Sequence, residues 1–278
     1  MDYARIVTDS TADVPAEIAE ELQISVVPAY VQFGERSYRD GIELSREAFF
    51  DRLPDMEEIP TTAVPPVDEW VDTYRDLVGK AERVIAITLS ATLSGMHDVA
   101  QVAAREVPEL DIQVVDSRQV TMGHGLQVIA AAEAARDGKD GDDILRMLSD
   151  MRSRVHVFAL LDTLSYVRRG GRVGWAQAMV AQILNIKPIL EVIEGAVDNI
   201  GRVRTRKQGL EKLIEIVQSH TPLERLSVIH TVAPEAEHLR ERLAELTAPD
   251  RIISTVVNTV IGAHVGPKGL GVALVTAR

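Results

Sequence analysis

The feature that most constrains the fold is an alternation, in the first half of the chain, of short β-branched runs with stretches of helical periodicity. Such runs predict buried strands, and helices between them predict crossover connections that make neighbouring strands parallel. We therefore expect a parallel sheet with crossover helices, in a three-layer arrangement. The predicted strands lie at 6–8, 24–31, 84–88 and 112–115, and the first predicted helix lies at 14–22.

The second half of the chain has a different pattern. Several of its strand-like runs lie near turn residues without a helix between them, which predicts a mixed sheet with helices on one face. The predicted strands are 155–160, 192–200, 226–231, 252–257 and 272–276. The predicted helices are 174–184, 208–219 and 235–247.

A polar, glycine-containing break at 136–143 separates the two patterns, and one more helix, to about Arg152, closes the first. A chain of 278 residues is also long enough for two domains. We predict an α/β protein with a three-layer, parallel-sheet domain at 1–152. A two-layer α/β domain with a mixed sheet is predicted at 153–278.

Composition excludes several functional classes. A net charge of −12 and only 4% aromatic residues argue against nucleic-acid binding, which needs a basic face or a base-stacking platform. No stretch approaches the roughly 20 apolar residues that span a bilayer. The chain has no cysteine, which removes disulfides, thiolate zinc sites and thiol nucleophiles. With no signal-like segment at the N-terminus, we expect a cytoplasmic protein, and no cofactor or metal is predicted.

Three predicted parallel strands end in small polar residues, in the segments 8–10, 88–95 and 116–117. Ligands of open parallel sheets bind beyond the carboxyl ends of the strands, so these segments are expected to converge on one site. Taken singly, each Asp or Ser is more simply interpreted as a cap of the following helix.

Ser94 and Gly95 precede a predicted helix at 96–104, where a hydroxyl and a backbone N–H meet the positive end of the helix. That environment suits a small anion such as a carboxylate. Thr62 lies in the proline-containing segment PTTAVPP at 60–66. The prolines favour an extended loop that could present its hydroxyl rigidly, although a plain surface turn is the simpler interpretation.

His264 lies among four glycines at 262–271, in a spacing that matches neither a phosphate loop nor a dinucleotide fingerprint. The glycines would let backbone approach closely, which favours a functional role for His264 over a purely structural one. Two basic clusters, at 168–172 and 202–207, stand out in an acidic chain. Each is either a solvated face or a positive rim that steers an anion into the site.

Taken together, these segments resemble the DegV family, whose characterised members include the fatty-acid-binding subunits of bacterial fatty acid kinase. The resemblance runs nearly end to end. The matching motifs are VTDSTAD at 7–13, YRDG at 38–41, LSG at 93–95, DS at 116–117, MGHG at 122–125, LDTL at 161–164, RGGR at 169–172, LNIKPIL at 184–190, VRTRK at 203–207 and HVGP at 264–267.

The resemblance implies that the chain binds a long-chain fatty acid between its two domains and is not itself an enzyme. It implies that Thr62 and Ser94, with the Gly95 N–H, hold the carboxylate. His264 and Arg204 would lie beside the headgroup and assist a separate ATP-dependent kinase that forms the acyl phosphate, with Arg172 at the rim. The sequence departs from the family at Ala63, Val64, Pro66 and Met96, so fewer polar groups would support the carboxylate.

A serine hydrolase acting on lipid-like esters is the alternative. Ser94 and His264, with Asp9 or Asp116, would form its triad. However, Ser94 lacks the preceding glycine of a Gly-x-Ser-x-Gly nucleophile elbow, which disfavours this interpretation.

Overall fold

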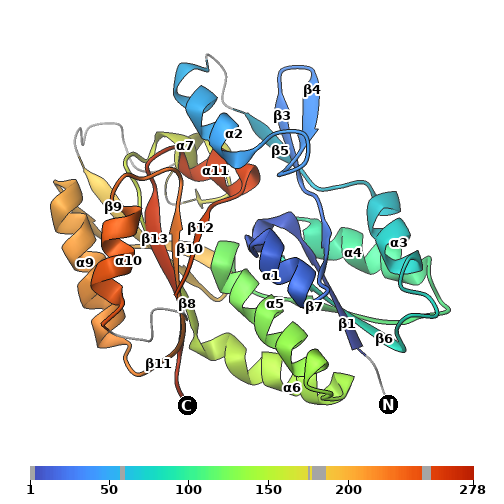
Figure 1. Cartoon of the computed structure of the whole chain (residues 1–278). Coiled ribbons are helices and arrows are strands. Elements are labelled where there is room, and N and C mark those ends of the chain that lie inside the picture. Colours follow the sequence, from blue (N-terminus) through green and yellow to red (C-terminus); the bar gives the residue numbers. More distant parts are fainter. Residues whose placement is uncertain (1–3, 57–59, 175, 177–185, 246–251) are drawn as a thin grey trace.

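The computed structural model describes residues 4–56, 60–174, 176, 186–245 and 252–278. Figure 1 shows two α/β units side by side, with a small sheet and helix α2 lying across one end of both. No helix in the described ranges is long and apolar enough to cross a bilayer. Short 3₁₀ helices lie at Ser10–Ala12, Leu53–Asp55 and Arg152–Arg154.

The first unit contains a four-stranded sheet in the order β2-β1-β6-β7, with all neighbours parallel. The predicted parallel sheet is therefore confirmed. Its strands are β1 (Ala4–Asp9), β2 (Ser25–Val27), β6 (Arg83–Thr88) and β7 (Asp111–Asp116).

Helices cover both faces of this sheet. Successive side chains of a strand point to opposite faces, and those of β6 pack against different helices on each face. Val84 and Ala86 pack with Trp70 and Tyr74 of α3, whereas Ile85 packs in a separate cluster with α5 and α6. The three-layer prediction is confirmed. The helices of this unit are α1 (Ala16–Glu21), α3 (Val67–Arg75), α4 (Met96–Arg105), α5 (Thr121–Arg136) and α6 (Gly141–Met151).

The second unit contains a six-stranded sheet in the order β10-β9-β8-β13-β11-β12. Only β11 and β12 are parallel, so the predicted mixed sheet is confirmed. Its strands are β8 (Val155–Leu160), β9 (Lys187–Ile193), β10 (Ala196–Val203), β11 (Leu223–His230), β12 (Ile252–Val256) and β13 (Leu270–Thr276).

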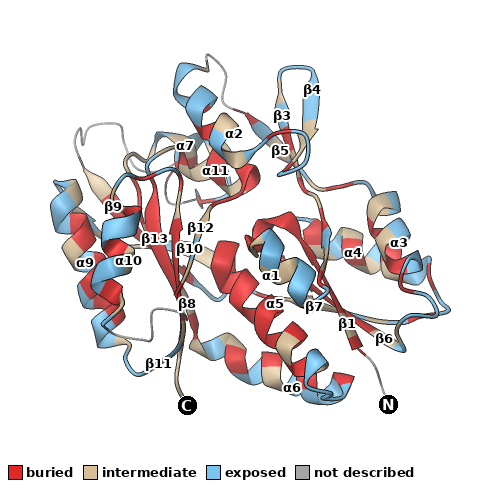
Figure 2. Cartoon of the chain, in the orientation of Figure 1, coloured by how far each residue is buried: buried red, intermediate tan, exposed pale blue. Residues whose placement is uncertain are grey.

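Helices α9 (Arg206–Ser219) and α10 (Ala236–Leu243) cover one face of the mixed sheet, as the two-layer prediction requires. The opposite face packs on α5, which is buried on nearly all sides because it lies between the two sheets (Figure 2). The remaining described helices of this half are α7 (Ser165–Gly170) and α11 (Thr259–Val265). The domain division at residue 152 stays a prediction.

A third, antiparallel sheet was not predicted. It has the order β4-β3-β5 and packs with α2 (Arg46–Arg52) against α11. The single strand predicted at 24–31 is wrong, because the chain passes at Pro28 from β2 in the first sheet to β3 in this one. Proline donates no hydrogen bond, and the next N–H, of Ala29, donates to Ser10 Oγ. The strands are β3 (Tyr30–Phe33), β4 (Arg36–Arg39) and β5 (Thr61–Ala63).

The strand predicted at 192–200 is also wrong. Glu194 and Gly195 have φ of 48° and 83°, and they form a two-residue turn that reverses the chain between β9 and β10. Left-handed φ at both central residues matches the twist of a hairpin, and Gly195 adopts it without strain. Most of the helix predicted at 174–184, and the end of the one at 235–247, lie outside the described residues.

Candidate ligand-binding site

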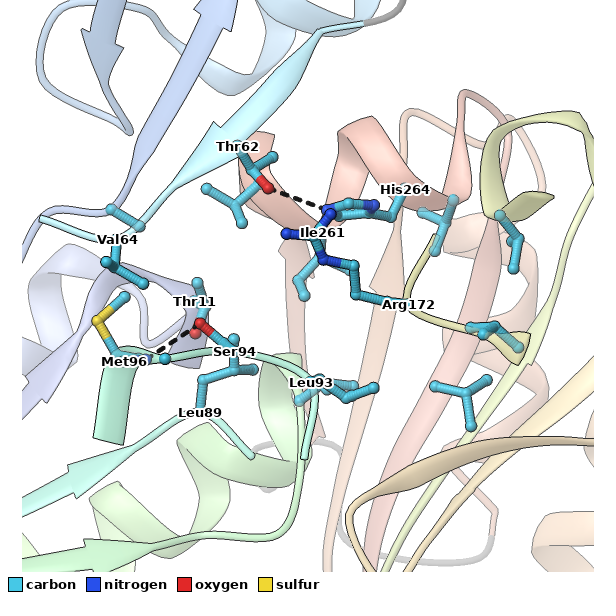
Figure 3. Close-up of a pocket in the computed structure, with 18 of the residues that line it drawn as sticks. Thr11, Thr62, Val64, Leu89, Leu93, Ser94, Met96, Arg172, Ile261 and His264 are labelled. Carbon is cyan, nitrogen blue, oxygen red and sulfur yellow. Dashed lines mark hydrogen bonds between the residues drawn. The ribbon is translucent and has the colours of Figure 1, made fainter. Parts of the chain in front are cut away.

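A cavity lies where the carboxyl ends of β1 and β6 meet β5, α11 and the β9–β10 hairpin. Its volume is about 170 Å³, many times the roughly 10–15 Å³ that one water needs. Figure 3 shows side chains from these separate elements pointing into the same space. Most of the wall is apolar, and its polar side chains are Thr11, Thr62, Ser94, Arg172 and His264.

Ser94 and Gly95 reach the cavity from the connection between β6 and α4. Gly95 is the N-cap residue of α4, and the Ser94 hydroxyl accepts a hydrogen bond from Met96 N at 3.2 Å. Within the described residues, the Gly95 N–H has no hydrogen-bond acceptor. The helix N-terminus therefore presents a free N–H and a serine O–H to the cavity, where an anion is favoured.

Thr62 and His264 form the opposite side of the polar end. Thr62 lies in β5, paired with Val31 of β3, so the predicted extended loop is a short strand. Its Oγ1 lies 3.1 Å from Nε2 of His264 in α11, as Figure 3 shows. The pairing of β5 with β3 fixes the backbone of Thr62, and α11 fixes the backbone of His264.

The His264 imidazole is neutral near pH 7. Burial, together with the nearby positive charge of Arg172, lowers the pKa of His264 to about 4. Nδ1 is buried and has no partner in the part of the chain that the structure describes. A Cβ at Gly170 would lie 2.2 Å from this nitrogen, so the glycine is what lets α7 approach the ring so closely.

Of the two arginines predicted near the headgroup, Arg172 lines the cavity and Arg204 does not. The Arg172 side chain extends toward His264 in Figure 3, and its Nη1 donates to Gly170 O at 3.0 Å. Arg204 is exposed just beyond the end of β10, where its N–H donates to Gln208 Oε1 at 3.2 Å. The geometry therefore puts a different arginine at the cavity from the one that the motif indicated.

A second, almost wholly apolar cavity of about 80 Å³ adjoins the first, between α5 and the mixed sheet. The two share five lining residues: Val120, Leu190, Val197, Ile261 and Val265. The first cavity carries the polar groups, and the second has almost wholly apolar walls. Sequence reasoning missed these five residues, because a buried aliphatic residue that lines a cavity has the same pattern as one in a packed core. It also missed Thr11, which lies in the VTDSTAD motif.

The chain reaches the cavity just after β1 and just after β6, but the predicted third segment, at the end of β7, does not line it. The Asp carboxylates at the ends of β1 and β7 accept hydrogen bonds from backbone N–H groups. Asp9 Oδ2 accepts the Leu89 N–H at 3.0 Å, and Asp116 Oδ1 accepts the Ala91 N–H at 3.2 Å. These bonds join the ends of β1 and β7 to the loop after β6. Within the described ranges neither carboxylate bonds to His264, whose Nε2 is paired with Thr62, so the hydrolase triad does not form. The same ranges contain no group of three metal-ligating side chains.

Comparison with known proteins identifies the family. The model of the DegV family, described as uncharacterised proteins, matches residues 4–277. The chain belongs to the DegV family. A DegV domain-containing protein of Streptomyces coelicolor is 36% identical over 281 residues, which cover 98% of each chain.

Solved DegV structures have the same fold. A DegV family protein from Thermus thermophilus, described by its fatty acid binding, superposes with a TM-score of 0.90 at 29% identity, covering 99% of this chain and 100% of that one. DegV from Bacillus subtilis, described as a fatty acid binding protein, gives 0.89 at 31% identity and full coverage of both chains.

Proposed function

We propose that this protein binds a long-chain fatty acid, with the carboxylate at Thr62, Ser94 and the Gly95 N–H and the acyl chain along the two adjoining cavities. The observation that carries the proposal is the polarity of this path, which has hydrogen-bonding groups at one end and apolar walls beyond. The fatty acid binding described for the Thermus thermophilus and Bacillus subtilis proteins supports it.

The acyl chain would supply most of the affinity. Each methylene removed from water contributes about 0.8 kcal/mol, so a chain of roughly fourteen contributes about 11 kcal/mol before the cost of ordering it. Most of the lining side chains are aliphatic, and they come from both α/β units. A ligand lying against them would be shielded from water along most of its length.

The carboxylate would be fixed by hydrogen bonds, because a buried charge without partners is costly. Ser94 Oγ already accepts from Met96 N, which leaves its O–H to donate to the ligand. If Nε2 of neutral His264 donates to Thr62 Oγ1, the Thr62 O–H is likewise directed to the ligand. The imidazole would then orient a donor without adding a charge.

The protein would act as a carrier that presents the acid to a separate ATP-dependent kinase in the cytoplasm, where an acyl phosphate for phospholipid metabolism forms. It would need no cofactor of its own. His264 and Arg172, at the polar end, would stabilise charge on the carboxylate and the incoming phosphoryl group. Arg204, exposed and outside the cavity, would act only by contacting the kinase.

Extraction of the purified protein with organic solvent, followed by mass spectrometry and an ester-hydrolysis assay, tests the proposal. A carrier yields about one long-chain fatty acid per chain and leaves esters intact. Turnover of ester substrates that Ser94→Ala abolishes would support the hydrolase instead.

A further inference from the structure

A buried cluster of charges lies outside the cavity, at the point where all three sheets meet. Asp13 and Asp40 are buried, and the guanidinium of Arg46, from α2, lies between them. Arg46 Nη1 is 2.9 Å from Asp13 Oδ1, and Nη2 is 3.8 Å from Asp40 Oδ2. Nη1 also donates to Val256 O at 2.6 Å, at the end of β12.

Both carboxylates hold the first residues of α11. Asp13 Oδ1 accepts the backbone N–H of Asn258, the N-cap residue, at 2.8 Å, and Asp40 Oδ1 accepts the N–H of Thr259, also at 2.8 Å. The Asn258 side chain caps the helix through Ile261 N and also donates to Asp13. The start of α11 is therefore fixed by two carboxylates whose mutual repulsion is reduced by one cation.

Helix α11 carries a large part of the cavity wall. Four of its residues line the cavity: Val260, Ile261, His264 and Val265. On its other side, α2 packs closely at Gly262, where a Cβ would lie 2.5 Å from the ring of Phe50. Because Arg46 and Phe50 lie on the same helix, α2 holds α11 both through the charge cluster and through an apolar contact.

We propose that Arg46 is a positioning residue for the ligand site: by pairing with Asp13 and Asp40 it fixes the start of α11, and so keeps His264 within hydrogen-bonding distance of Thr62. The expected effect of Arg46 on ligand binding rests on the proposed fatty-acid function. Arg46 touches no cavity surface, so its effect reaches the ligand only through α11.

The energetics favour a strong dependence on Arg46. Burial raises the pKa of Asp13 to about 6, and the charge of Arg46 is the main influence that opposes the rise. Without the cation, two carboxylates would share a buried space, an arrangement that is much less stable than the paired one. Separation of the two carboxylates would relieve that repulsion. Because each accepts a hydrogen bond from the start of α11, the helix start and His264 would shift with them.

The test uses Arg46→Gln and the conservative Arg46→Lys in the full chain, with Arg52→Ala, an exposed arginine of the same helix, as the matched control. Melting temperature reports stability. The side-chain NMR signals of His264, assigned by their loss in His264→Gln, report its hydrogen bond without any ligand. A fluorescent long-chain fatty acid reports binding. A double variant, Arg46→Gln with Asp13→Asn, removes one of the unbalanced charges.

Arg46→Gln should shift the His264 signals. It should also weaken binding about tenfold or more, because Val260, Ile261 and Val265 of the cavity wall move with α11. The double variant should partly restore both the His264 signals and the affinity for the fatty acid. Arg46→Lys should show smaller changes than Arg46→Gln, and Arg52→Ala should match the wild type. His264 signals unchanged in Arg46→Gln, or in Arg46→Lys if the former does not fold, would overturn the inference, even if the melting temperature falls. If the wild type binds no fatty acid, the proposed function fails, and the His264 signals alone decide the role of Arg46.

Discussion

The Thr62 hydroxyl oxygen lies 3.1 Å from Nε2 of His264, although 202 residues separate the two in the chain. The bond joins the small sheet to α11 across the polar end of the cavity, so each residue orients the other. Replacing Thr62 by Ala should weaken fatty-acid binding by about 1–3 kcal/mol, because the carboxylate loses a donor and His264 loses a partner. Titration with a fluorescent fatty acid measures this. Thr62→Ser, which keeps the hydroxyl, is the control, and equal binding by Thr62→Ala would place the headgroup elsewhere.

Ser94→Ala should also weaken retention of the lipid by about 1–3 kcal/mol, since the carboxylate is left with one donor fewer. The Met96 N–H loses its acceptor as well, so some stability should be lost. Bound lipid per chain, measured after extraction, and the melting temperature separate these two effects. Full lipid content in Ser94→Ala and Thr62→Ala alike would contradict the assigned headgroup site.

Binding and phosphorylation should depend on different residues. His264→Gln and Arg172→Ala should keep most of the bound lipid but lose most acyl-phosphate formation with a partner kinase and ATP. Stabilisation of charge that develops only in the transition state barely affects ground-state affinity.

Arg204→Ala is the comparison, because Arg204 is exposed and lies outside the cavity wall. If it contacts the kinase, its loss should raise the kinase concentration needed for half-maximal rate while lipid content stays unchanged. Full kinase activity in all three variants would exclude an assisting role for these residues.

The pH dependence of stability should carry the signature of His264. The pKa of His264 is lowered from 6.5 to about 4 in the folded protein, so between these values the unfolded chain binds a proton that the folded chain does not. The free energy of unfolding should therefore fall as pH falls from about 6.5 to about 4, by about 2 kcal/mol between pH 7 and pH 5. Urea unfolding of the wild type and of His264→Gln at both pH values measures this contribution.

Asp13 acts in the opposite direction, because its raised pKa makes the folded chain the tighter proton binder between about pH 4 and pH 6. Burial also lowers the pKa of His124 and of His230, so the wild type alone would show the sum of all these effects. The prediction for His264 fails if its variant shows the same change of unfolding free energy between pH 7 and pH 5 as the wild type.

Chain-length preference should depend on the second cavity. Ala159 lines it, on β8, and Ala159→Leu adds bulk where the distal part of the acyl chain would lie. Affinity for long acids should fall by about 0.8 kcal/mol for each methylene displaced, while shorter acids are affected less. Ala91→Leu, at an exposed position, is the control. An equal loss for all chain lengths would mean that the chain does not reach this cavity.

The sequence predicts the parallel and mixed sheets because most of their strands are short β-branched runs bounded by turn residues. Strands β1, β6 and β7 are short apolar runs that end in Asp or Thr, and their positions follow from that pattern alone. Breaks inside an apolar run leave a weaker trace. Pro28 and the Glu194–Gly195 turn each divide a stretch that hydropathy alone joins.

The site is only partly predictable for a different reason. Thr62, Ser94, Gly95 and His264 belong to motifs, and the fold brings them to one cavity. The choice between Arg172 and Arg204 depends on where α7 and β10 end in space, which no local pattern encodes. The cluster of Asp13, Asp40 and Arg46 likewise joins residues whose pairing follows from tertiary packing alone.

The most direct test of the central claim compares palmitate with its methyl ester on delipidated protein, by isothermal titration calorimetry. The ester keeps the acyl chain but removes the anionic carboxylate, so it isolates the polar end of the path from the apolar walls. The account predicts that palmitate saturates one site per chain and that the ester binds at least about tenfold more weakly, since hydrogen bonds to a charged group contribute about 1.5–3 kcal/mol. Equal affinity for the two, or no saturable binding of palmitate, would contradict it.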